Sequence, residues 1–181
     1  MELITGIKER RSVRKYTEDA VTVEDIEKLV EIAKYAPSWK NTQTVRYNAV
    51  FNKETMQKIS EEATYGFAGN QKILAGAPCL IVMSTKDHIA GYERDGSATT
   101  DQGDHWQSFD AGIAAQTFCL AAHEAGFGTV IMGIFEEAKV KEIINLPEGE
   151  IVTALIAVGK PKFAPDAPPR KELEKLLRVV E

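Results

Sequence analysis

Three arginines and a serine stand within one five-residue segment near the N-terminus, Arg10-Arg11-Ser12-Val13-Arg14. Guanidinium groups offer paired planar donors to phosphate oxygens, and a serine can add its hydroxyl or its backbone N–H to the same anion. This segment is therefore a candidate phosphate-binding site. The alternative is that these cations only close a helix over residues 2–9, because positive charge favours the negative end of a helix dipole. Spacing alone leaves both interpretations open.

A second segment, Ala36-Pro37-Ser38-Trp39-Lys40-Asn41-Thr42-Gln43, gathers amide and hydroxyl groups after an alanine and a proline. Asn41 and Gln43 can each donate and accept hydrogen bonds, which the uracil-like edge of a flavin or a purine requires. The alternative is a helix that ends at the proline and is followed by an ordinary polar turn.

Several other catalytic and metal-binding patterns are excluded by their spacing. Gly126-Phe127-Gly128 follows a predicted helix and lacks a third glycine, which is the wrong order for a dinucleotide-binding fingerprint. The pair His123-Glu124 has Phe127 where a zinc site needs its second histidine, so we expect His123 to be satisfied by solvent or by a neighbour. No Gly-x-Ser-x-Gly sequence occurs. We expect no metal ion and no covalent hydrolysis.

The chain has 181 residues, 44% of them hydrophobic, and a formal net charge of −5. This length fits one domain over residues 1–181, and the negative charge argues against a nucleic-acid or membrane-surface partner. Cys79 and Cys119 lie in apolar runs and are interpreted as buried thiols, which indicates a reducing compartment. No run reaches the roughly 18 apolar residues that span a bilayer, and no secretion leader is recognisable, so we expect a cytoplasmic protein.

Hydrophobic spacing predicts the elements that must position the two polar segments. Thr22, with Asp25 three residues later, predicts the start of a helix whose apolar positions run to Ala33 before Pro37 stops it. The longest predicted helix is rich in alanine and glycine, which lets another helix or a planar ligand come close. Helices are expected at 2–9, 53–63, 108–125, 136–144 and 171–178, and strands at 45–51, 79–84, 129–134 and 151–158.

Two regions are predicted to lack regular structure. Residues 88–104 combine acidic residues, glycines and threonines, which is typical of a long loop. Whether this loop acts as a lid over a binding site is left open by the sequence. Residues 159–170 contain four prolines, so we expect an extended arm over about 160–181 that lies across a partner. Two helices precede any strand, and this order favours an α+β fold over a doubly wound one.

Taken together, these segments resemble the nitroreductase family. RRSVRKY is followed about 25 residues later by APSWKNTQ, then by Asn70, the helix DAGIAAQTFCLAAHEAGFGT, the run VIMG and a closing GKP with Arg170 downstream. Each motif is weak, but their order and spacing extend over nearly the whole chain.

The resemblance implies an α+β homodimer with a central antiparallel or mixed sheet flanked by helices, an exchanged C-terminal arm and two FMN sites where the subunits meet. It assigns the FMN phosphate to Arg10, Ser12, Arg14 and Arg170, with Lys160 as a further contact, and Arg11 to the ribityl chain or the ring edge. It places Pro37, Ser38, Trp39 and Asn41 against the flavin of the partner subunit, Asn70 and Lys72 beside the ring or ribityl chain, and Ile131, Met132 and Gly133 along the ring face.

The activity that the resemblance implies is a ping-pong transfer in which NADH or NADPH reduces FMN and a small electron-poor acceptor, such as a nitroaromatic or a quinone, is then reduced. The flavin carries this chemistry, so no catalytic side chain is expected. Two alternatives stay open: a flavin-binding or sequestering protein with little turnover, and a specialised relative that fragments flavin or removes halogen. Thr44 stands where the family usually has proline, and Trp39 where a small residue is common, which puts the acceptor range in question.

Overall fold

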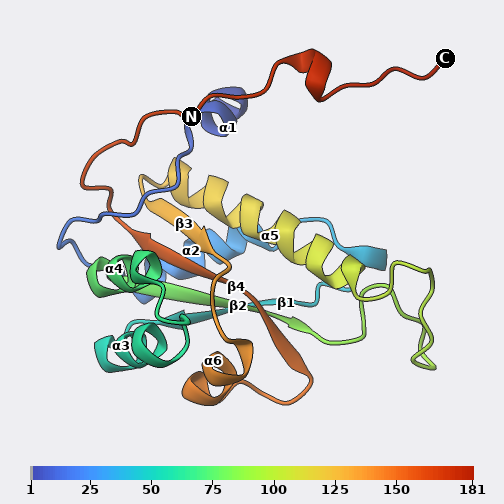
Figure 1. The fold of residues 1–181 in the computed structure, drawn as a ribbon, viewed down its shortest axis with the longest axis horizontal. Helices are drawn as coiled ribbons and strands as arrows, with labels where there is room; N and C mark the ends of the chain where they lie inside the picture. The colour runs from blue at the N-terminus through green and yellow to red at the C-terminus, as the bar shows by residue number, and fades with distance from the viewer. Residues whose placement is uncertain (1) are drawn as a thin grey trace.

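Helices cover both faces of one antiparallel sheet in this computed structural model, which describes residues 2–181. Figure 1 shows α5 crossing one side of the sheet, with α3, α4 and α6 on the other side. The helices are α1 (Leu3–Glu9), α2 (Val23–Ala33), η1 (Trp39–Asn41), α3 (Lys53–Glu62), α4 (Ala68–Gly76), α5 (His105–Glu124), α6 (Glu137–Ile144) and η2 (Leu173–Lys175). The strands are β1 (Val45–Val50), β2 (Cys79–Lys86), β3 (Gly128–Met132) and β4 (Glu150–Gly159).

The sheet has the order β1-β2-β4-β3, and each neighbouring pair is antiparallel. Successive side chains of a strand point to opposite faces. On β2, Leu80 and Val82 therefore join the core under α3, α4 and α6, whereas Ile81 and Met83 join the core under α2 and α5. Both faces are buried by helices, and the predicted α+β class is confirmed.

Local sequence signals explain how two of these helices begin. The Thr22 hydroxyl accepts a hydrogen bond from the Asp25 backbone N–H at 3.1 Å, and the Asp25 carboxylate accepts one from the Thr22 backbone N–H at 2.9 Å. This reciprocal cap confirms the predicted start of α2. Asn52 caps α3 in a similar way, because its side-chain oxygen accepts from the Thr55 N–H at 2.8 Å.

Several predicted boundaries were wrong; β2, for example, ends at Lys86 rather than at 84. Helix α5 begins at His105, three residues before the predicted start at 108, and β3 ends at Met132 rather than at 134. The expected helix at 171–178 is a single 3-10 turn over Leu173–Lys175, because its apolar side chains are exposed and no packing within residues 2–181 supports a longer helix. Helix α4 was not predicted at all. Residues 88–104 form the expected loop, with only turns and an isolated Tyr92–Ala98 bridge among its described residues.

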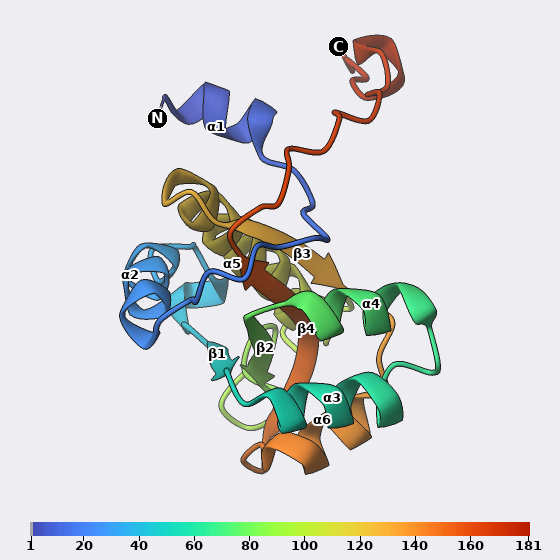
Figure 2. The same cartoon turned by 90° about the vertical axis from the view of Figure 1, so that its left-hand side faces the viewer.

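The two ends of the chain meet beside the sheet before they leave it. The Thr17 N–H donates to the Lys160 carbonyl at 2.9 Å, and the Lys162 N–H donates to the Lys15 carbonyl at 3.0 Å. Beyond this pairing, α1 and the C-terminal arm (residues 161–181) both lie past α5, away from the sheet (Figures 1 and 2). Over residues 2–181, no helix has both the length and the apolar character needed to cross a membrane.

Candidate functional site

The arginine-bearing segment 10–14 runs alongside β3. Ser12 forms a parallel bridge with Thr129, and the Val13 N–H donates to the Thr129 carbonyl at 2.9 Å. Val13 is 5% exposed and packs into the core, which anchors the segment. Arg10 and Ser12 are half-buried and Arg14 is exposed, so the polar side chains remain accessible on either side of this anchor.

A cavity of about 220 Å³ lies between this segment, the end of α5 and the start of the C-terminal arm. Arg10, Arg11, His123 and Phe127 line it, together with apolar arm residues. Nε of Arg10 and Nε2 of His123 are both buried, and neither has a hydrogen-bond partner among residues 2–181. A buried donor without a partner costs free energy, so these atoms indicate a missing polar ligand.

The guanidinium groups of segment 10–14, of which Arg10 and Arg11 line the cavity and Arg14 does not, are only partly occupied by contacts within the chain. Arg11 Nη1 donates to the carbonyls of Lys8 and Arg10 at 2.6 and 3.0 Å, and Arg14 Nη1 donates to the Ser12 carbonyl at 3.2 Å. Each guanidinium has five N–H donors, so most of them stay available for an anion.

The two basic residues predicted from the far end of the chain have different positions. Lys160 lies near the cavity, with Nζ 3.9 Å from the centre of the Phe127 ring, a residue of the cavity wall. Arg170 lies on the exposed arm and donates to the Pro168 carbonyl at 3.0 Å. Neither Lys160 nor Arg170 lines this cavity, although Lys160 contacts Phe127 in its wall.

A second group of predicted residues meets where α4 approaches the end of β3. Asn70 is 5% exposed, and its Nδ2 donates to the Ile134 carbonyl at 2.9 Å, which ties α4 to the segment after β3. Met132 is buried, whereas Ile131 is 46% exposed. A Cβ added to Gly133 would meet nothing within 4 Å. The backbone there is open to the close approach of a flat ring. Lys72 is exposed on α4.

The predicted polar turn at residues 37–43 is held by α5. The Trp39 N–H donates to both carboxylate oxygens of Asp110, at 3.1 and 2.9 Å, and the Ser38 hydroxyl accepts from the Gln43 N–H at 3.0 Å. Pro37 and Asn41 are exposed, and Ser38 and Trp39 are half-buried. A cavity of about 250 Å³ adjoins the turn, with Asp110 among its lining residues.

This turn and the arginine cavity lie at opposite ends of α5. His123 lines the arginine cavity and Asp110 holds the turn, and thirteen residues separate the two positions. At 1.5 Å per residue the separation along the helix is about 20 Å. One chain therefore does not bring all the predicted site residues to one place.

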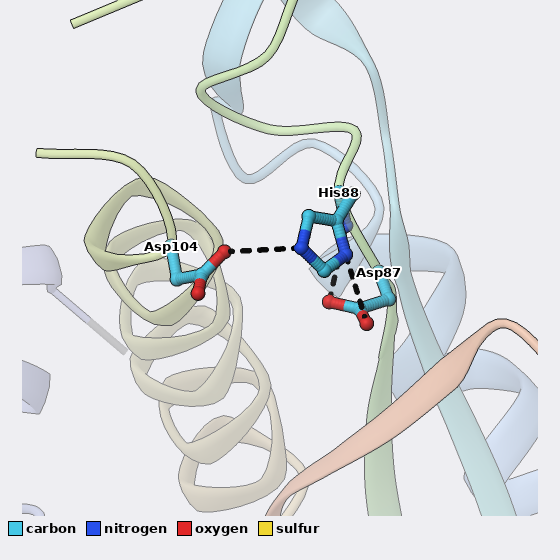
Figure 3. Close-up of side chains that lie close together, drawn as sticks. All are labelled: Asp87, His88 and Asp104. Carbon is cyan, nitrogen blue, oxygen red and sulfur yellow. Dashed lines mark hydrogen bonds and ion pairs between the residues drawn. The ribbon is translucent and has the colours of Figure 1, made fainter. Parts of the chain in front are cut away.

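A histidine between two carboxylates closes the base of the 88–104 loop (Figure 3). His88 Nδ1 lies 3.0 Å from a carboxylate oxygen of Asp87, and Nε2 lies 3.8 Å from one of Asp104. The buried Gln107 side chain donates to Asp87 at 3.1 Å and accepts from the His88 N–H at 3.2 Å. These contacts join the end of β2 to the start of α5.

The residues described above fit both the phosphate end and the ring end of FMN. The buried, unpartnered Arg10 Nε and His123 Nε2 fit a phosphate, and the open backbone at Gly133 beside Asn70 fits a ring. Two residues of the candidate site were not predicted from the sequence. His123 was expected to be satisfied, and Asp110 was not considered, although a lone carboxylate among the small apolar residues of one helix was a signal for a buried polar contact.

Comparisons of sequence and of structure both match this chain to nitroreductases and flavin oxidoreductases. The sequence model of the nitroreductase family matches residues 7–160. An FMN reductase [NAD(P)H] of Bacillus subtilis is 29% identical over 88% of this chain and 66% of its own length. An NADPH-flavin oxidoreductase of Vibrio harveyi is 29% identical over 92% of this chain and 69% of its own. The solved structure of an FMN-dependent nitroreductase from Clostridium difficile superimposes with a TM-score of 0.78 at 26% identity, covering 99% of both chains.

Proposed function

This chain belongs to the nitroreductase family, and from that premise we propose that it is an FMN-dependent oxidoreductase. It moves electrons from NADH or NADPH to a small electron-poor acceptor, such as a nitroaromatic or a quinone, by a ping-pong mechanism. The observation that carries the proposal is the arginine-lined cavity with its buried, unpartnered Arg10 Nε and His123 Nε2. Relatives named for FMN and NAD(P)H support the choice of cofactor and electron donor.

The residues around the cavity hold the phosphate. Arg10 and Arg14 supply guanidinium donors from both sides of the Val13 anchor, and Ser12 adds a hydroxyl between them. Lys160 adds a point charge from beside Phe127. Arg170 reaches the phosphate when the arm packs against the partner subunit in the dimer. Their combined positive charge offsets the phosphate charge in a chain that is negative overall.

The residues between α4 and β3 hold the ring. Asn70 is fixed by its bond to the Ile134 carbonyl. Ile131, Met132 and the open Gly133 backbone form the surface on which one ring face lies. Arg11 and Lys72 are the candidates to place positive charge at the ring edge where reduction leaves negative charge. When bound, the flavin supplies the redox chemistry.

A second copy of the chain completes the site. Residues 37–43 lie about 20 Å from the arginine cavity along α5, so Pro37, Ser38, Trp39 and Asn41 reach a flavin that is held mainly by the partner subunit. The exposed apolar side chains of the arm support the same assembly. They are Phe163, Leu173, Leu176, Leu177, Val179 and Val180, each at least 53% exposed in the single chain. We place this homodimer, with residues 1–181 as one FMN-binding domain, in the cytoplasm, where the free thiols Cys79 and Cys119 stay reduced.

Spectroscopy of the purified protein tests the proposal. The protein should bind FMN and be yellow, and anaerobic addition of NADH or NADPH should bleach the flavin absorbance. Addition of p-benzoquinone or a nitroaromatic should then restore the absorbance. A protein that stays colourless after incubation with excess FMN would contradict flavin binding. Bound flavin that neither nicotinamide reduces would instead favour a sequestering protein.

A further inference from the structure

We propose that Asp110 is a positioning residue for the acceptor pocket: its buried carboxylate fixes the 37–43 turn and through it the 88–104 loop. This inference rests on the proposed function, in which the turn borders the ring of the partner subunit's flavin. It goes beyond that function because it assigns control of acceptor entry to a side chain that touches neither flavin nor acceptor.

The contact between Asp110 and the turn is direct and buried. Asp110 is 3% exposed, and both its carboxylate oxygens accept from the single Trp39 N–H. Burial raises the pKa of the Asp110 carboxyl, and the bond from Trp39 offsets part of that rise. A buried carboxylate that accepts from only one donor among residues 2–181 is costly for the fold. Asp110 is the one acidic residue among the buried residues of α5, most of which are alanine, and this cost indicates a purpose other than stability.

The turn needs an external support because its own backbone is strained. Lys40, Asn41 and Gln43 have φ values of 45°, 55° and 49°. Three non-glycine residues in the left-handed region within four positions are unfavourable unless the surroundings hold them. Within the turn, the Ser38–Gln43 bond is one such support. The Trp39–Asp110 bond connects the turn to α5, beside the packing of the Trp39 ring on Trp106 of the same helix.

Two sets of contacts connect the turn to the 88–104 loop, one through Trp106 at the start of α5 and one directly from Lys40. The Trp39 ring packs against that of Trp106, with centroids 4.7 Å apart, and the Trp106 Nε1–H donates to the Thr100 hydroxyl at 2.9 Å. Lys40 Nζ forms an ion pair with Glu93 at 3.0 Å. Turn and loop are therefore connected through Trp39 and Lys40, and we expect release of Trp39 from Asp110 to loosen both connections.

The tryptophan pair gives a readout that is independent of flavin and of activity. Trp39 and Trp106 are the only two tryptophans in the sequence. Two indoles this close couple their electronic transitions, which gives a paired positive and negative signal in circular dichroism. This couplet reports whether Trp39 stays in place, while the helical signal and the melting temperature report whether the protein is folded.

The test compares Asp110→Ala with Asp110→Asn, which keeps one oxygen to accept from Trp39. Glu62→Ala is the matched control, because it removes an exposed carboxylate on α3 far from the turn. Asp110→Ala should lose the couplet but keep its helical signal. Its KM for a quinone acceptor should rise about tenfold with kcat changed far less, since a misplaced pocket wall weakens binding. Asp110→Asn and the control should keep the couplet and a near-normal KM.

The outcomes separate this inference from the proposed function. A couplet that survives in Asp110→Ala, or is lost equally in Asp110→Asn, would overturn the positioning role. If the couplet behaves as expected but no flavin binds, the proposed function fails and the structural link between Asp110 and Trp39 stands. Should Asp110→Ala fail to fold, hydrogen exchange at the Trp39 amide of the unaltered protein decides. Strong protection supports the inference, and exchange as fast as that of an exposed amide overturns it.

Discussion

Val13 fills the space directly over Gly128, so that a Cβ added to this glycine would lie 2.6 Å from the Val13 Cβ. Real Cβ atoms essentially never come this close. The missing side chain at Gly128 therefore lets the N-terminal segment lie against β3. Arg10 and Arg14, on either side of Val13, owe their positions to that contact.

Gly128→Ala should weaken FMN binding although it changes none of the residues that contact the phosphate. The added methyl would push Val13 and the 10–14 segment away from β3, and overpacking of this kind costs about 1–3 kcal/mol. Flavin content after purification and the FMN dissociation constant measure the effect. Gly76→Ala is the matched control, because a Cβ there meets nothing within 4 Å. If Gly128→Ala binds FMN as tightly as this control, the segment is not held as we describe.

Replacing Arg10 and Arg14 together with alanine should give colourless protein. Each hydrogen bond to a charged group contributes about 1.5–3 kcal/mol, so the double variant should bind FMN at least roughly a hundredfold more weakly. Riboflavin, which lacks the phosphate, should bind the variant and the unaltered protein about equally. The exposed pair Lys58→Ala and Arg94→Ala removes the same charge elsewhere. A yellow double variant with full flavin content would show that the phosphate lies elsewhere.

The parts of the fold that could be predicted are those whose signals are local. The Thr22–Asp25 cap and the apolar spacing of α2 gave its position because both act within a few residues. Helix α4 carries no such signal. Its first residue follows Phe67, which makes no side-chain cap, and its apolar and polar residues are not segregated to two faces. It forms because Ile73 and Leu74 pack into the core from a sheet built elsewhere in the sequence.

The residues of the candidate site could likewise be predicted only where their signals are local in the sequence. Arg10, Ser12 and Arg14 were recognisable because they are clustered in sequence, and the family resemblance singled out Asn70. The contact of Asp110 with Trp39 joins residues 71 positions apart, and the shared cavity of Arg10 and His123 depends on how the chain ends fold back over α5. Such long-range contacts follow from the packing of the whole chain, which spacing within one segment does not contain.

The thiol of Cys79 should be unreactive in the native protein and should make stability depend on alkaline pH. Cys79 is 0% exposed, and burial raises its pKa to about 12. The folded thiol keeps its proton where the unfolded thiol ionises. Its contribution to stability is therefore complete below the ordinary thiol pKa and is lost as pH rises toward 12, by roughly 1.4 kcal/mol per pH unit.

Two measurements check this prediction. A thiol reagent at pH 8 should label neither Cys79 nor Cys119 until the protein is unfolded, because burial also raises the Cys119 pKa. Urea titrations from pH 8 to 11 should show a shallower loss of unfolding free energy in Cys79→Ala than in the unaltered chain. Rapid labelling of the native protein, or equal slopes in the two proteins, would contradict the assigned burial.

Shortening the arm should dissociate the proposed homodimer. The last eleven residues expose Leu173, Leu176, Leu177, Val179 and Val180, at 58% or more each, and contribute no core residue to their own chain. Burying such side chains stabilises an assembly by about 25 cal/mol for each Å² of apolar surface that leaves water. Removal of residues 171–181 should therefore shift the mass in sedimentation equilibrium at micromolar concentration from two chains toward one, while the melting temperature of the subunit changes little. Flavin content should fall together with the mass. Without the dimer, neither Arg170 nor the 37–43 turn of the partner subunit stays at the flavin.

Lys175→Glu, which alters the same segment without removing apolar surface, should remain dimeric and yellow. If the unaltered protein already sediments as a single chain, or the shortened one stays a dimer with full flavin, the arm does not hold the two copies together.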